Sequence, residues 1–374
     1  MKTITLTPDA SGMVDWPTLS NDKKSVVTIG SFDGMHQGHQ AVIRRVAELA
    51  EQEQAFSVVV LFDPRPALVH AYAAKHDGQE PPAGTPDTQA LTSVDERLRA
   101  IDAIGVDYTL IVRYTMAFSA KSYRFFLGQM VGKLGMRTLV LGSDAAMGAN
   151  RAGNVKAIEN LALATGVFQL EVVDDFGPGL TRVPVNAKPV MPSEPGEPSD
   201  PLEGASKAER RAWSKKHQAK EVRTWSSTNV RYLLAHGRIQ DANAILGAPH
   251  SIEGEVVHGE ERGRTIGFPT ANLGSDIAGY IPVDGVYAGW LVDGENRWPA
   301  AISIGTKPTF SEKTGLNERV VEAYCITEEW IDLYDHKVRV EFVGFLRPQV
   351  KFDGPDQLVD ELKRNVEETK RLTA

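Results

Sequence analysis

Short apolar runs alternate with helix-like segments from Val26 to about Val173, and this alternation constrains the fold of the first half of the chain more than any other feature. The apolar runs are V-V-T-I-G (26–30), S-V-V-V-L-F (57–62), Y-T-L-I-V (108–112), T-L-V-L-G (138–142) and F-Q-L-E-V-V (168–173), and the helix-like segments cover 40–53, 94–104, 122–134 and 154–165. Strands and helices that alternate in this way form a doubly wound parallel sheet. We therefore predict an α/β domain in which a nucleotide would bind at the carboxyl ends of the strands.

The pattern changes from about Pro249. Strand-like pieces recur there at short spacing, with a D-G-E-N turn among them, at 252–258, 285–292, 299–305, 319–326 and 337–346. Such spacing favours an antiparallel β-barrel, and the segment 356–372 is predicted to close it as a C-terminal helix. A chain of 374 residues suits two domains of these kinds.

An insert is predicted between the two patterns. A proline recurs every few residues from Pro184 to Pro201, and 203–223 carries many charges of both signs. We expect a solvated insert with some helix; basic side chains that steer a nucleotide or touch RNA are the alternative. The predicted boundaries are 1–183 for the first domain, 184–224 for the insert, 225–247 for helices that complete the first domain, and 248–374 for the second.

The segment His76 to Gln89 has no apolar periodicity and is predicted to be a surface loop, with a lid over a site as the alternative.

The net charge of −8 argues against a protein that coats nucleic acid or an anionic membrane, so we expect small-molecule partners. The single cysteine, Cys325, lies in an apolar stretch and is expected to be a packed thiol in a reducing compartment. No apolar run is long enough to span a membrane, and we expect a cytoplasmic protein. The oligomeric state stays open.

A glycine-rich turn, T-I-G-S-F-D-G-M-H-Q-G-H at 28–39, follows the first apolar run directly. Its glycines let the backbone approach a ligand, and His36 and His39 share one face of the first helical turn. Free N–H groups at a helix start attract an oxyanion, and imidazoles can donate to charge that develops on phosphorus. The spacing alone leaves a solvated face or half of a metal site as alternatives.

A serine-rich helix start, W-S-S-T-N-V-R, occupies 225–231. Ser226 or Ser227 is a plausible N-cap, and Arg231 follows about one turn later. Exposed hydroxyl and N–H groups with an arginine suit a phosphate. A purely capping role is the alternative.

The string G-R-T-I-G-F-P-T-A-N at 263–272 is the most specific in the second half. If Thr270 to Asn272 is extended, the hydroxyl and the carboxamide lie on one side as two neutral oxygen ligands for Mg²⁺ beside a triphosphate. Gly263 and Gly267 would allow a flap over the phosphates. A simple turn is the alternative.

Glu322 lies in an otherwise apolar strand, V-V-E-A-Y. An unpaired carboxylate there is costly unless it is paired, exposed or functional. It is a candidate general base. An ion pair with Arg319 or Arg339 is the alternative.

These motifs together resemble a known family. The 28–39 string resembles the H-x-G-H signature of class I nucleotidyltransferases, in the version of bacterial FAD synthetases. The 263–272 string, with P-V-D-G-V-Y-A-G, A-I-S-I-G-T-K-P-T-F and L-R-P, resembles riboflavin kinases. The chain as a whole is similar to bifunctional riboflavin kinase/FAD synthetases. The resemblance implies a Rossmann-like first domain that makes FAD and pyrophosphate from FMN and ATP, and a barrel that makes FMN from riboflavin and ATP, both with Mg²⁺.

The resemblance also implies roles for individual residues. His36, His39 and Glu322 match catalytic groups, and Thr270 and Asn272 match the magnesium ligands. The implied nucleotide contacts of the adenylyltransferase are Gly30, Phe32, Asp33, Gly34, Gly38, Asp144, Ser226, Ser227, Thr228 and Arg231. Those of the kinase are Gly263, Arg264, Thr265, Gly267, Pro269, Thr270 and Asn272.

The sequence departs from the family pattern at three places. The 141–148 loop keeps Asp144 but lacks two phenylalanines, Arg65 stands where histidine is common, and Lys307 stands where asparagine is usual. These departures leave two alternatives open beside the bifunctional enzyme. One is a riboflavin kinase whose first domain is a nucleotidyltransferase for another acceptor; the other has a first domain that only binds flavin nucleotide as a regulatory module.

Overall fold

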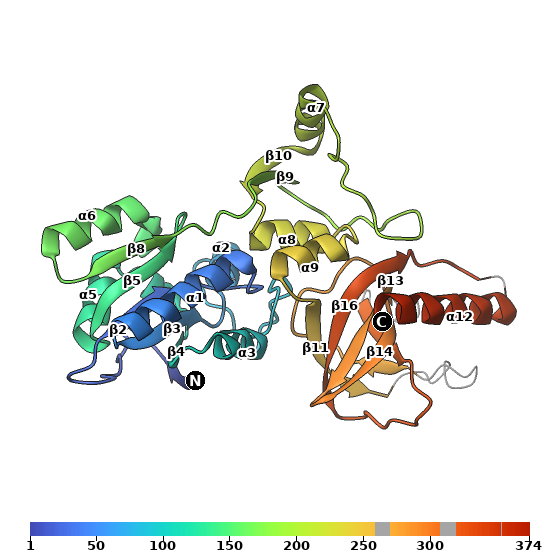
Figure 1. The fold of residues 1–374 in the computed structure, drawn as a ribbon, viewed down its shortest axis with the longest axis horizontal. Helices are drawn as coiled ribbons and strands as arrows, with labels where there is room; N and C mark the ends of the chain where they lie inside the picture. The colour runs from blue at the N-terminus through green and yellow to red at the C-terminus, as the bar shows by residue number, and fades with distance from the viewer. Residues whose placement is uncertain (259–269, 307–318, 353) are drawn as a thin grey trace. The chain divides into compact units, whose positions relative to one another are not determined.

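The computed structural model describes residues 1–258, 270–306, 319–352 and 354–374 (Figure 1). The chain divides into two compact units. The first comprises Met1–Ala90 and Val94–Gly179, and the second comprises Leu91–Ser93 and Leu180–Ala374.

The first unit is built on a six-stranded sheet in which every neighbouring pair is parallel. The order is β1 (Lys2–Leu6), β4 (Tyr108–Val112), β3 (Phe56–Phe62), β2 (Ser25–Ile29), β5 (Met136–Gly142) and β8 (Gln169–Val173). β2 has β3 on one side and β5 on the other, so the direction of winding reverses between β2 and β5. The loops that follow these two strands therefore meet at the switch point, where α/β sheets bind their ligands.

Helices cover both faces of this sheet. α1 (Gln37–Gln52) and α3 (Val94–Ile104) pack on one face, and α5 (Tyr123–Lys133) and α6 (Val155–Thr165) pack on the other. Figure 1 shows α1 lying along its face of the sheet. The cause is visible in β3, whose run of residues 58–61 is fully buried, with alternate side chains contributing to opposite cores. The predicted doubly wound sheet is confirmed.

Some elements of this unit were not predicted. They are β1, α2 (Pro66–Lys75), α4 (Met116–Ser119), the short pair β6 (Ala146–Met147) and β7 (Gly153–Asn154), and a 3₁₀ turn at Ala149–Arg151. Pro64, two residues before α2, and Pro66 indicate the end of a strand. Pro66 also occupies the first position of the helix, where a proline is compatible with helical geometry.

The second unit contains a closed antiparallel barrel, as predicted. Its strands follow the order β11 (His250–Val257), β12 (Ala271–Leu273), β15 (Arg319–Cys325), β14 (Asn296–Thr306), β13 (Gly285–Asp293) and β16 (Lys337–Arg347). The predicted C-terminal helix is α12 (Pro355–Leu372). Leu372 packs against Val286, Ala288 and Leu346, whose strand neighbours point into the barrel core, so α12 covers part of the outer face.

The segment before the barrel contains the predicted helix of the insert, α7 (Lys207–His217), bracketed by the antiparallel pair β9 (Leu180–Pro184) and β10 (Ala219–Arg223). α8 (Ser227–Leu234) and α9 (Ile239–Leu246) follow, and their apolar faces join the core cluster of the barrel. Residues 225–247 thus lie in the second compact unit. That they complete the site of the first domain stays a prediction. No helix in the described part of the chain has the length and apolarity to cross a membrane.

Candidate functional sites

The turn after β2 sets the position of the first site. Gly30 continues the sheet by donating from its N–H to the carbonyl of Val60 at 3.1 Å. Phe32, Gly34 and Met35 then adopt positive φ values of 46°, 83° and 43°. Such values are strained for the two non-glycine residues. Both of these side chains are buried in the core beside α1 and α3, which holds the turn in place.

The two histidines lie together at the start of α1. His36 is the N-cap, and its Nδ1 accepts a hydrogen bond from the N–H of His39 at 3.4 Å. The imidazole rings are stacked, with centroids 3.6 Å apart. A Cβ at Gly38 would lie 2.9 Å from the carbonyl oxygen of Asp175 and 3.2 Å from Nδ1 of His36. The glycine between the histidines is therefore required by the close packing of this turn.

His39 is held in its neutral form. Its side chain is half-buried, but its Nδ1 is enclosed and has no hydrogen-bond partner among the described residues. Burial, followed by the nearby charges of His36 and Arg97, lowers the pKa of His39 well below its ordinary value. A neutral imidazole at the positive end of a helix can donate one hydrogen bond to an anionic ligand.

The loop after β5 lies on the other side of the switch point. Ser143 donates to Oδ1 of Asp175 from both its N–H, at 3.1 Å, and its hydroxyl, at 3.0 Å. A Cβ at Gly142 would lie 2.2 Å from the Asp175 carboxylate, so this glycine also allows a close approach. Asp144, the predicted nucleotide contact, is exposed beside this junction. Asp175 was not predicted as a site residue, although it lies two residues after the strand predicted at 168–173.

A cluster of charged groups lies at the end of β3. Arg65 donates to Asp33 at 3.0 Å and to both carboxylate oxygens of Asp87, at 2.7 and 2.8 Å. Arg97 donates to the carbonyls of Ser31 at 2.9 Å and Phe62 at 3.3 Å. The turn after β2 is therefore fixed by two arginines. Asp33, predicted as a nucleotide contact, is only 3 % exposed and faces Arg65.

The serine-rich segment begins α8. Ser226 is its N-cap, because its hydroxyl accepts from the N–H of Asn229 at 3.2 Å and donates to the carbonyl of Arg223 at 2.8 Å. Ser227, Thr228 and Arg231 lie in the helix. Of the two serines predicted as caps, the structure selects Ser226. The phosphate-binding role of this segment stays a prediction.

The second site lies on the barrel. Asn272 on β12 is directly paired with Glu322 on β15, and Glu322 is directly paired with Ser303 on β14. Directly opposite residues in a sheet share one face. The neighbours Val321 and Ala323 are fully buried in the barrel core, so the three side chains form a row on the outer face, called here the outer-face row.

The contacts of this row fit the predicted chemistry. The amide nitrogen of Asn272 donates to the carbonyl of Thr270 at 3.2 Å, which leaves the carboxamide oxygen as the atom for a cation. Gln349 donates to the hydroxyl of Ser303 at 3.0 Å and to the carbonyl of Ile304 at 2.9 Å. Ser303 and Gln349 were missed, although Ser303 alternates with the buried residues of its strand.

The ion pairs considered for Glu322 are directed elsewhere. Arg319 binds Asp284 at 2.7 Å, and Arg339 binds Glu341 at 2.9 Å. The described residues contain no cluster of three or more histidine, cysteine, aspartate or glutamate side chains that could hold a metal. Burial raises the pKa of the Cys325 thiol to about 12, as expected of a packed cysteine.

Several predicted kinase residues lie outside the described residues. They are Gly263, Arg264, Thr265, Gly267 and Pro269, together with the departure at Lys307. Their roles stay predictions.

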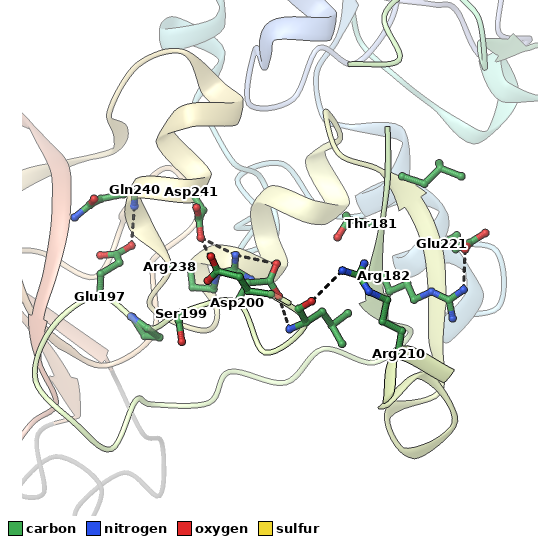
Figure 2. Close-up of a pocket in the computed structure, with 14 residues that line it drawn as sticks. Thr181, Arg182, Glu197, Ser199, Asp200, Arg210, Glu221, Arg238, Gln240 and Asp241 are labelled. Atoms are coloured by element: carbon green, nitrogen blue, oxygen red, sulfur yellow. Dashed lines mark hydrogen bonds and ion pairs between the residues drawn. The ribbon is translucent and has the colours of Figure 1, made fainter. Parts of the chain in front are cut away.

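A separate pocket of about 750 Å³ lies in the second unit, among β9, β10, the insert and the start of α9 (Figure 2). Its charged groups bind one another: Arg182 pairs with Glu221, and Arg238 pairs with Asp200 and Asp241. Glu197 accepts from the N–H of Gln240 at 2.7 Å. These contacts tie the insert to α9.

Comparisons with known proteins cover both units. The family described as FAD synthetase matches residues 18–186, and the family described as riboflavin kinase matches residues 246–373. A protein of Listeria monocytogenes named bifunctional riboflavin kinase/FMN adenylyltransferase is 30% identical over 354 residues, which is 94% of each chain. A protein of the same name from Escherichia coli K12 is 30% identical over 91% of this chain and 90% of its own. One from Bacillus subtilis is 27% identical over 93% and 92%.

A solved structure supports the fold. The crystal structure titled macrolide-efflux protein from Streptococcus pneumoniae matches with a TM-score of 0.71, covering 99% of both chains at 24% identity. At this identity the match shows the fold alone.

Proposed function

The chain belongs to the family of bifunctional riboflavin kinase/FMN adenylyltransferases, and we propose that it converts riboflavin to FMN on its barrel and FMN to FAD in its sheet unit. ATP is the co-substrate of both reactions. The observation that carries the kinase assignment is the direct pairing of Asn272 with Glu322 on the outer face of the barrel. For the adenylyltransferase it is the stacking of His36 on His39 at the start of α1.

In the kinase reaction, Glu322 takes the proton of the primary alcohol of riboflavin as the alcohol oxygen attacks the γ-phosphorus of ATP. The new bond joins this oxygen to phosphorus, and the bond to the bridging oxygen breaks to release ADP. Glu322 suits this role because its side chain lies on the outer face of the barrel, and the apolar core is on the inner face. The Gln349 contacts hold Ser303 beside it.

Magnesium fits the residues next to this base. Thr270 and Asn272 offer neutral oxygens, which a hard cation accepts together with phosphate oxygens. When bound, Mg²⁺ would offset the negative charge of the triphosphate. The Asn272 side chain is oriented by its hydrogen bond to Thr270 before any ligand arrives.

In the adenylyl transfer, a phosphate oxygen of FMN attacks the α-phosphorus of ATP, and pyrophosphate leaves. The FMN phosphate is ionised near pH 7, so the attack requires no base from the protein. His36 and His39 donate hydrogen bonds to the charge that develops on the α-phosphate, at the positive end of the α1 helix dipole. A neutral His39 loses no proton in this role.

The remaining nucleotide contacts are proposed from the resemblance. Asp144 lies at the switch point after β5 and would contact the nucleotide there. The start of α8, with Ser226, Ser227, Thr228 and Arg231, would bind phosphates. A cytoplasmic location is proposed from the single packed cysteine.

One assay tests both activities. Purified protein is incubated with riboflavin, ATP and Mg²⁺, the flavins are separated by chromatography, and the assay is repeated with FMN. We expect FMN first and FAD afterwards. FMN without FAD would instead support a first domain that acts on another acceptor or only binds flavin nucleotide. The presence of both stacked histidines argues against a first domain that only binds flavin nucleotide.

A further inference from the structure

A buried ion network in the first unit contains two residues, Arg65 and Asp87, to which neither reaction assigns a role. Arg65 lies between Asp33, in the turn after β2, and Asp87, at the end of the 76–89 segment. The side chains of Arg65, Asp33 and Asp87 are 8 %, 5 % and 18 % exposed. Pairs at the surface contribute little, but removing one member of a buried pair leaves an uncompensated charge.

Asp33 connects this network to the catalytic turn. It stands between Phe32 and Gly34, both at positive φ, and three residues before His36. Arg65 reaches it with one nitrogen of the guanidinium group while the other donors bind Asp87. A shift of Arg65 would therefore act on the backbone that leads into α1.

Asp87 holds the guanidinium group in a fixed plane. Its carboxylate also accepts from the N–H of Gln89 at 3.2 Å, and its carbonyl accepts from the N–H of Ala90 at 3.0 Å. These two hydrogen bonds within the turn at Asp87 fix the position of its carboxylate. Both oxygens meet the fork of Arg65, an arrangement that a histidine at position 65 could not reproduce, because an imidazole has no such fork.

Resting on the proposed adenylyl transfer, we propose that Arg65 and Asp87 are positioning residues, which act through Asp33 on the turn that carries His36 and His39. Neither touches the substrates in this role. The 76–89 segment then supplies a fixed anchor to the site. The departure from the family pattern at Arg65 is matched by the carboxylate of Asp87.

The test compares two charge-removing variants of the same segment. Asp87→Asn should lower kcat for FAD formation by about ten-fold and leave the KM values for FMN and ATP within about two-fold. The reason is that His36 and His39 are misplaced while the residues that bind FMN and ATP are unchanged. FMN formation from riboflavin, which takes place on the barrel, should not change. Asp77→Asn is the matched control, because Asp77 is exposed in the same segment, and it should leave both activities unchanged.

A second pair of variants tests the coupling. Arg65→Lys keeps the charge but loses the fork, and should lower kcat as Asp87→Asn does. The double variant should be no slower than the slower single variant, because both changes break one connection. If Asp87→Asn does not fold by circular dichroism, Asp87→Glu replaces it; the longer side chain keeps the charge and should lower kcat by a smaller factor.

The outcomes separate the two proposals. If the unchanged protein forms no FAD from FMN, the adenylyltransferase assignment fails. Suppose instead that the unchanged protein forms FAD. The positioning role is then overturned if the Asp87 variant matches the Asp77 control, or if its KM rises while its kcat is unchanged, and the adenylyltransferase assignment stands.

Discussion

Asn272 and Glu322 occupy directly paired positions on neighbouring strands of the barrel, so the proposed metal ligand and the proposed base share one face of the sheet. Backbone pairing fixes this relation, since β12 and β15 cannot slide without breaking their hydrogen bonds. The geometry of the kinase site therefore depends on strand register as well as on the two side chains.

Glu322→Gln should reduce FMN formation by roughly 100- to 10,000-fold, because the amide cannot take the proton of the alcohol. FAD formation from added FMN should remain. Glu295→Gln, in the exposed β13–β14 turn, is the control and should have no effect. Both are measured by flavin chromatography. Turnover retained in the Glu322 variant would leave this carboxylate with a structural role.

Asn272→Leu should raise the Mg²⁺ concentration required for half-maximal FMN formation, by roughly ten-fold if one protein ligand is lost. Leucine fills similar space but offers no oxygen. The Mg²⁺ titration is repeated for FAD formation, which should not change. An unaltered titration for FMN formation would show that Asn272 does not bind the cation.

His39 should remain neutral throughout the physiological range. Because burial lowers its pKa, the folded protein does not take up a proton there as the pH falls through 6.5, whereas the unfolded chain does. Stability contributed by the neutral ring is therefore lost as the pH falls. NMR titration of labelled histidines should show no transition of His39 between pH 8 and 6. A titration midpoint of His39 near pH 6.5 would contradict its role as a neutral hydrogen-bond donor.

His250 should make the second unit sensitive to acid. It is 1 % exposed, its Nε2 donates to the carbonyl of Tyr280 at 2.7 Å, and burial lowers its pKa to about 4. The unfolded chain binds the proton first, so stability falls between pH 6.5 and about 4.

The loss from His250 should reach about 2 kcal/mol between pH 7 and pH 5. His250→Gln can keep a donor to Tyr280 but has no group that titrates. The free energy of unfolding of this variant, measured in urea, should therefore fall by about 2 kcal/mol less between pH 7 and pH 5. Equal losses in both proteins would assign the acid sensitivity to other groups.

Gly289→Ala should destabilise the barrel by roughly 1–3 kcal/mol or prevent it from folding. A Cβ there would lie 1.9 Å from the carbonyl oxygen of Glu341 and 2.6 Å from Ile302. Gly128→Ala, on the exposed side of α5 with nothing nearby, should instead stabilise by about 0.5–1 kcal/mol. Thermal unfolding compares the two, and the opposite order would contradict the close strand packing at Gly289.

Local patterns predicted most elements well. The helix expected at 94–104 is α3 with the same bounds, and five of the six strands of the barrel were predicted from their short spacing. The strand that was not predicted is β12. The order of the strands was less accessible. β12 has three residues and separates β11 from β15, so no pattern within it specifies its neighbours.

In the candidate sites too, residues close in sequence were predicted and contacts between distant residues were not. His36 and His39 are close in sequence, so one motif places both on one helical turn. Asp87 is 22 residues from Arg65, and Asp175 is 32 residues from Ser143. Such contacts depend on how the loops of different strands meet, and neither pair has a spacing that marks it. These two long-range contacts, an ion pair and a hydrogen bond, were therefore found only in the structure.

The alternation in β15 has a consequence for how the barrel reaches its native pairing. A shift of one residue would turn Glu322 into the apolar interior and expose the buried Val321 and Ala323. Burying an unpaired carboxylate costs far more than losing a few apolar contacts. The residue proposed as the base thus also penalises misaligned strands, and a variant that loses its charge would lose part of this protection against misfolding.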